Sequence, residues 1–80
     1  MNYERLNDLR LLGLTIAYYR RAKGMTQAEL AEAVHISRTH MSNIDAPNTK
    51  TSISLNLLFD IAEALDIPVK ELFDFQGRSL

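Results

Sequence analysis

The sequence predicts an all-α fold, a compact bundle of five helices. Glycine, proline and helix-capping residues divide the 80-residue chain into five segments, and apolar residues recur at helical spacing within them. Valine and isoleucine are too scattered to form the alternating runs of β-strands. A chain of this length buries only about 60–65% of its unfolded surface, which suits helices with local contacts. We expect one domain over residues 1–75 and a frayed tail over 76–80.

The first expected helix runs from about Tyr3 to Lys23. Gly24 is suited to end it in the left-handed conformation, and basic residues of the last turn complement the helix dipole. Apolar residues at helical spacing form its inner face. These residues are Leu9, Leu12, Ile16 and Tyr19.

Two short helices are expected next, joined by a tight turn at residues 35–36. Thr26 and Glu29 form a capping box at the start of the helix that continues to Val34. Ser37 caps the following helix, from which Met41 and Ile44 point inward. This helix closes before Pro47, because the residue that precedes a proline disfavours the α conformation.

The last two expected helices follow a polar loop over residues 48–52. The fourth is capped by Ser54 or Ser52 and runs to about Leu65, and a short fifth helix covers residues 69–73. The fourth helix has a wide apolar face that we expect to cover the core. Its members are Leu55, Leu58, Phe59, Ile61, Ala62 and Leu65.

Composition narrows the class of protein. The chain has no cysteine, which excludes a disulfide framework or a thiolate site and fits a reducing compartment. No apolar run reaches the roughly 18 residues that a membrane span needs, and no secretory signal is visible at the start. We therefore expect a cytoplasmic protein with no membrane contact.

Charge is distributed unevenly along the chain. Residues 1–40 carry six Lys/Arg and four Asp/Glu, whereas residues 41–80 carry three and six, so that the halves sum to a net charge of −1. Such asymmetry is typical of a protein with one face for an anionic partner. Ordinary surface charge explains the same numbers, and composition alone leaves both readings open.

The second and third expected helices have the lengths of a DNA-reading unit, in which the later helix lies in the major groove. The buried positions of that helix leave four polar residues exposed. Arginine and asparagine make bidentate hydrogen bonds to guanine and adenine, and serine and threonine contact either base. A merely solvated helix would usually carry Glu and Lys instead. We therefore expect DNA base contacts from Arg38, Thr39, Ser42 and Asn43.

Several segments, in order and at the right intervals, resemble the Cro/cI-type (xenobiotic-response-element-type) helix-turn-helix regulators. They are LGxxI at 12–16, YRRxKG at 19–24, MTQAELA at 25–31, ISRTxMSxI at 36–44 and LxxLxxIAxALxIxxxxLF at 55–73, where x marks a position that carries no resemblance. The resemblance covers about residues 12–73 and implies a lambda-repressor-like DNA-binding domain. At His35 this chain departs from the glycine that the family usually has in the turn.

The resemblance also implies roles for individual residues. Gln27 matches a phosphate contact at the start of the second helix, where free amides favour an anion. Arg20 matches an arginine that pairs with an acid at the end of the third helix, here Asp45. We expect this ion pair to set the angle of the recognition helix. The residues expected at the DNA backbone are Gln27, His40, Asn48 and Lys50.

Additional apolar residues form a second stripe on the first helix, and one lies off the core face of the fourth. They are either scattered surface apolarity, which is normal, or the contacts of a homodimer that reads two half-sites about 34 Å apart. The sequence leaves both readings open. The candidate contacts are Leu11, Leu14, Tyr18 and Leu57.

Other chemistry is disfavoured. His35 and His40 are five residues apart with one in a turn, which does not suit a helical metal pair. The chain has no phosphate-cradling glycine loop and no nucleophile elbow. We expect no enzyme activity, metal, cofactor or small-molecule ligand. The sequence predicts a transcriptional regulator, in the first instance a repressor, that binds a double-stranded DNA operator. A protein–protein module, such as an antitoxin-like regulator, is the alternative on the same fold.

Overall fold

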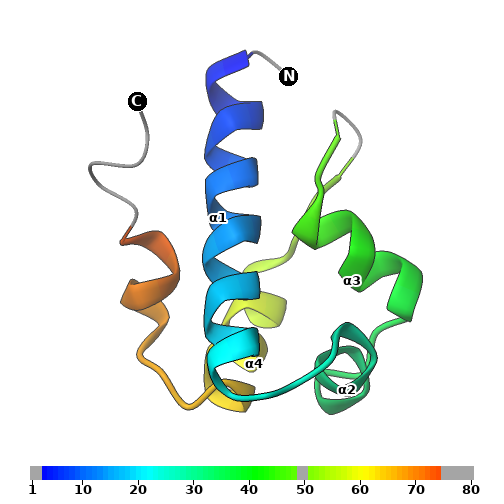
Figure 1. The fold of residues 1–80 in the computed structure, drawn as a ribbon. Helices are drawn as coiled ribbons and strands as arrows, with labels where there is room; N and C mark the ends of the chain where they lie inside the picture. Colours follow the sequence, from blue (N-terminus) through cyan, green and yellow to red (C-terminus); the bar gives the residue numbers. More distant parts are fainter. Residues whose placement is uncertain (1–2, 49–50, 75–80) are drawn as a thin grey trace.

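Four α-helices and one short 3-10 helix make up the part of the chain that the computed structural model describes, residues 3–48 and 51–74. In Figure 1, α1 stands at the centre, with α2 and α3 on one side and the final short helix on the other. Within these residues there is no strand, which confirms the all-α class. The elements are α1 (Tyr3–Ala22), α2 (Gln27–Ala33), α3 (Arg38–Asp45), α4 (Leu55–Ala64) and η1 (Val69–Phe73).

The expected fifth α-helix is a 3-10 helix, which corrects the count. Its hydrogen bonds run from Glu71 N to Pro68 O at 3.0 Å and from Asp74 N to Glu71 O at 3.4 Å. A five-residue element is too short to establish the α-helical ladder, and the tighter i to i+3 pattern is common in such short pieces. The tail expected at 76–80 lies outside the described residues.

Side-chain caps begin the three helices that follow α1, as the sequence predicts. The Thr26 hydroxyl accepts a hydrogen bond from Glu29 N at 3.0 Å, and Thr26 N donates to the Glu29 carboxylate at 2.8 Å. Ser37 accepts from His40 N at 3.0 Å. Ser54 accepts from Leu57 N at 3.1 Å, so Ser54 rather than Ser52 caps α4. These caps use amides that have no partner inside their helix.

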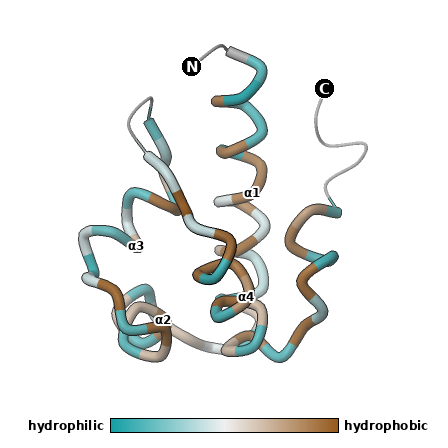
Figure 2. Tube along the Cα trace, turned by 180° about the vertical axis from the view of Figure 1, so that it is seen from behind, coloured by the Kyte–Doolittle hydropathy of each residue, from teal (hydrophilic) through white to brown (hydrophobic). Residues whose placement is uncertain are grey.

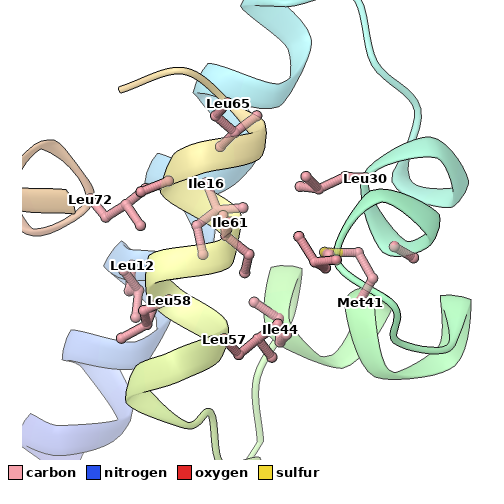
Figure 3. Close-up of a cluster of buried hydrophobic side chains, with 13 residues drawn as sticks. Leu12, Ile16, Leu30, Met41, Ile44, Leu57, Leu58, Ile61, Leu65 and Leu72 are labelled. Carbon is pink, nitrogen blue, oxygen red and sulfur yellow. The ribbon is translucent and has the colours of Figure 1, made fainter. Parts of the chain in front are cut away.

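The core is a cluster of buried side chains contributed by all five elements (Figure 3). Leu30, Met41 and Leu72 bring α2, α3 and η1 onto the sides of α1 and α4 that face each other. Tyr19 packs at the edge, and its hydroxyl donates to the Glu71 carboxylate at 3.3 Å. Partial burial, together with this carboxylate, raises the pKa of Tyr19 above its usual value.

The face that α4 turns to the core differs from the predicted face. Leu57, which was expected off the core, is buried in the cluster. Leu55 and Phe59, which were expected inside, are 64% and 51% exposed. The sequence of α4 carries two overlapping apolar stripes, and packing against both α2 and η1 selects the stripe through Leu57, Leu58 and Ile61. Leu11, another candidate dimer contact, is also largely buried, with 8% of its surface exposed.

At Gly13, the backbone of α1 comes close to the backbone of α3. A Cβ atom at this position would overlap the carbonyl oxygen of Ile44 and lie 3.0 Å from that of Asp45. The missing side chain therefore allows α3 to pack directly on α1 (Figure 1). No helix in residues 3–48 or 51–74 is both long enough and apolar enough to cross a bilayer.

His35, in the turn between α2 and α3, has a left-handed backbone conformation with φ at 61°. We expect His35→Gly to raise the free energy of unfolding by about 0.5–1 kcal/mol, because glycine adopts this conformation without the Cβ clash. Urea unfolding followed by circular dichroism measures the change. The control is Ala28→Gly at an exposed position inside α2, where glycine should lower stability by up to about 1 kcal/mol. A loss of stability in His35→Gly would contradict the assigned strain.

Candidate nucleic-acid interface

Helices α2 and α3 and the turn between them form a rigid unit. Ile36 N donates to Ala31 O at 3.0 Å and Val34 N donates to Leu30 O at 3.1 Å, so that the turn is hydrogen-bonded back onto α2. Leu30 and Met41 are fully buried between the pair and the rest of the core. The packing of the inner side of α3 therefore fixes the orientation of this helix.

The outer side of α3 is polar. Its two buried residues, Met41 and Ile44, anchor the inner face. In Figure 2, much of the tube along α3 is hydrophilic, whereas α4 is largely hydrophobic. His40 lies half-buried beside the outer face. The structure brings the expected base-reading side chains together as exposed neighbours on two successive turns: Arg38, Thr39, Ser42 and Asn43.

Gln27 stands at the first position of α2, but its side chain is engaged within the protein. The amide Nε2 donates to Asp45 Oδ2 at 2.6 Å. Because the two residues are 18 apart in sequence, this contact between the start of α2 and the end of α3 was missed by sequence reasoning, and no local pattern signals it. A charge-assisted hydrogen bond of this length is among the stronger polar contacts in proteins.

Arg20 and Asp45 lie together beneath this contact. Arg20 Nη2 lies 3.7 Å from Asp45 Oδ2, and the two side chains are only 8% and 10% exposed. Arg20 Nη1 also donates to Met25 O at 2.7 Å, which ties α1 to the residue before the α2 cap. Within the described residues, Arg20 Nε and Asp45 Oδ1 are buried without a hydrogen-bond partner. The guanidinium of Arg20 is thus held inside the protein by contacts to α3 and to the residue before the α2 cap.

After α3, Asn48 is hydrogen-bonded to Thr51. Asn48 N donates to the Thr51 hydroxyl and Thr51 N donates back to Asn48 O, each at 3.0 Å. Asn48 is exposed and lies three residues beyond the end of α3. Lys50, the other loop residue expected at the DNA backbone, lies outside the described residues.

Among the residues that the structure describes, no three His, Asp or Glu side chains are grouped closely enough to hold a metal ion. His35 is in the turn and His40 is on α3. The arrangement is suited to polar contacts with a surface laid against α3.

The helix-turn-helix family model matches residues 16–72, and the chain belongs to this family. This match confirms the resemblance to Cro/cI-type regulators. The members of the family are DNA-binding regulators rather than enzymes. The match lies within the 12–73 range expected from the sequence.

Individual relatives agree with this assignment. The HTH-type transcriptional regulator SinR of Bacillus subtilis (strain 168) is 33% identical over 64 residues, which are 80% of this chain and 57% of SinR. The chain thus matches little more than half of the length of that relative. The restriction-modification controller protein C.AhdI of Aeromonas hydrophila has a TM-score of 0.75 and 32% identity, covering 82% of this chain and 97% of C.AhdI. SinR is described as a master regulator for biofilm formation, and its structure in complex with DNA is also similar. That structure has a TM-score of 0.70 and 33% identity, covering 79% of this chain and 98% of the SinR chain.

Proposed function

We propose that this chain is a sequence-specific transcriptional regulator that acts as a repressor, by occupying its operator with α3 in the major groove. The observation that carries the proposal is the outer face of α3. Its four exposed side chains, Arg38, Thr39, Ser42 and Asn43, are all types that hydrogen-bond base edges, and none is acidic. The packed inner face already fixes the backbone of α3, so that only these side chains lose conformational freedom on binding.

In this proposal, residues on either side of α3 contact the DNA backbone. The start of α2 supplies free amides, and Gln27 reaches a phosphate by exchanging its hydrogen bond to Asp45. His40, Asn48 and Lys50 complete the set. Such contacts position the protein without reading sequence.

The pair of Arg20 and Asp45 serves a structural role in this account. It joins α1 to the last residue of α3, at the end of the recognition helix farther from the base-reading residues Arg38 and Thr39. Its burial favours a part in setting the angle of α3 over a part in binding DNA.

Selection of bound sequences from a random DNA pool at about 100 mM salt tests base reading. We expect an enriched motif, and Arg38→Ala/Asn43→Ala should lower the affinity for it by roughly 100-fold, because each bidentate contact contributes about 1–3 kcal/mol. Lys70→Ala on η1, which also removes an exposed positive charge, should leave the motif intact. Failure of the wild-type chain to enrich any motif would overturn operator reading and direct attention to protein partners.

Self-association is part of the proposal, since two copies can read two half-sites of one operator in the bacterial or phage-host cytoplasm. Of the residues expected at such a contact, Leu14 and Tyr18 are each 62% exposed. Leu57 is excluded because it lies in the core, and Leu11 lies on the floor of a groove beside the exposed pair. A symmetric motif from the selection would support two-copy binding.

A further inference from the structure

One face of α1 carries six residues at spacings of three, four, three, four and three. This alternation keeps residues on one side of a helix and is the spacing of a seam between two paired helices. The face is distinct from the one that enters the core through Leu12 and Ile16. We call this set the α1 seam, and its members are Glu4, Asn7, Leu11, Leu14, Tyr18 and Arg21.

The part of the α1 seam from Leu11 to Arg21 lines an open, largely apolar groove of about 660 Å³. Leu11 and Thr15 form its floor, and the exposed side chains of Leu14 and Tyr18 stand beside them. Contiguous exposed apolar surface of this kind commonly marks an interaction site.

The α1 seam is symmetric about its own centre. Counting inward from the two ends, Glu4 corresponds to Arg21, Asn7 to Tyr18, and Leu11 to Leu14. Neither Glu4 nor Arg21 forms an ion pair within the part of the chain that the structure describes. An antiparallel copy of the same helix would therefore place leucine on leucine at the centre and opposite charges at both ends.

We infer that α1 pairs antiparallel with α1 of a second copy of this chain through the α1 seam. The inference rests on the self-association included in the proposed function and names its surface. A two-fold contact brings one patch against itself, so a self-complementary patch is what it requires. Each dimer gains two Glu4–Arg21 pairs and covers the groove at Leu14 and Tyr18.

The pairing is compatible with reading one operator. In an antiparallel helix pair the two-fold axis is perpendicular both to α1 and to the line that joins the two helices. α3 packs on α1 at Gly13, which points about 100° around the helix from Leu14. The axis can thus run towards the α3 side of both copies, and the two recognition helices face the same side, as two half-sites require.

The other exposed apolar face fits a second copy less well. Leu55 and Phe59 are exposed on α4, but the only charged residues of this helix are the acids Asp60 and Glu63. Two copies of α4 would bring like charges together without an opposite charge on the same helix. The complementary charges favour the α1 seam.

A charge exchange at the ends of the α1 seam tests the inference, with sedimentation equilibrium without DNA at low ionic strength. We expect the wild-type chain to dimerise, and Glu4→Arg or Arg21→Glu to raise the dimer dissociation constant about tenfold or more, since each replaces two attractions by two repulsions. The double exchange Glu4→Arg/Arg21→Glu restores the pairs and should return the constant to within about threefold. Leu14→Ser/Tyr18→Ser should raise it by roughly 100-fold. All of these positions are exposed, and circular dichroism verifies that the variants fold.

Three outcomes would overturn the inference. One is a wild-type chain that stays monomeric at high micromolar concentration. Another is a double exchange that does not restore association. The third is a dimer that survives Leu14→Ser/Tyr18→Ser but is lost in Phe59→Ser, which would assign the contact to α4. These outcomes can be distinguished from a failure of the proposed function. A monomer that still enriches a single half-site motif would contradict the pairing of α1 but would retain base reading by α3.

Discussion

Gly13→Ala is expected to lower the free energy of unfolding by about 2–3 kcal/mol. Alanine is the better helix former by about 1 kcal/mol, so an exposed helical glycine would gain from the same change. At Gly13 the added Cβ meets backbone carbonyl oxygens of Ile44 and Asp45, which cannot rotate away as a side chain can. Overpacking of this kind is relieved only by moving α3 away from α1.

Urea unfolding measures this loss, and Gly24→Ala is its matched control. Gly24 has φ at 71°, but a Cβ there would meet nothing within 4 Å. Alanine at this position should therefore cost only about 1 kcal/mol, from backbone strain alone. Gly13→Ala should also weaken operator binding, because α3 changes its tilt. A Gly13→Ala variant as stable as the wild type would contradict the close approach of α1 and α3.

Asp45→Ala is expected to destabilise the fold by about 3 kcal/mol. The substitution leaves the guanidinium of Arg20 buried without its carboxylate, and removal of one partner of a buried pair typically costs about 3–5 kcal/mol. The lower end applies because Arg20 keeps its hydrogen bond to Met25 O. Gln27 loses its acceptor as well.

The matched control is Asp8→Ala, since Asp8 lies 3.8 Å from Arg5 in an ion pair whose two side chains are both more than half exposed. Surface pairs of this kind contribute about 0–1 kcal/mol, so the control should change stability by no more than about 0.5 kcal/mol. If Asp8→Ala and Asp45→Ala lowered the free energy of unfolding by equal amounts, burial of the Asp45 pair would not contribute to stability.

Features set by a few neighbouring residues could be predicted from the sequence. The caps at Thr26, Ser37 and Ser54 depend on atoms within three residues, and the structure contains each of them. The exposure of Arg38 and Asn43 follows from the burial of Met41 and Ile44 on the same short helix. The left-handed conformation of His35 fits the glycine position that the resemblance to Cro/cI-type regulators implies.

Features set by tertiary packing could not be predicted in the same way. Leu55 and Leu57 are equally apolar, and only the positions of the neighbouring helices decide which of them is buried. The hydrogen bond of Gln27 to Asp45 joins two helices and has no local signature. The α1 seam could be predicted only in part, because its polar ends indicate a contact only once the structure shows that the residues from Leu11 to Arg21 line an open groove.

The most direct test of the central claim, that α3 reads base edges, compares wild type and Arg38→Ala on operators that carry each of the four base pairs at one position. The selected motif supplies the position, and fluorescence anisotropy at constant salt supplies the affinities. If Arg38 reads a base, the wild type should prefer one pair by roughly tenfold or more, and Arg38→Ala should bind all four about equally while preferences elsewhere persist. A uniform loss of affinity on all four operators, with the preference retained, would place Arg38 on the DNA backbone and contradict base reading by this residue.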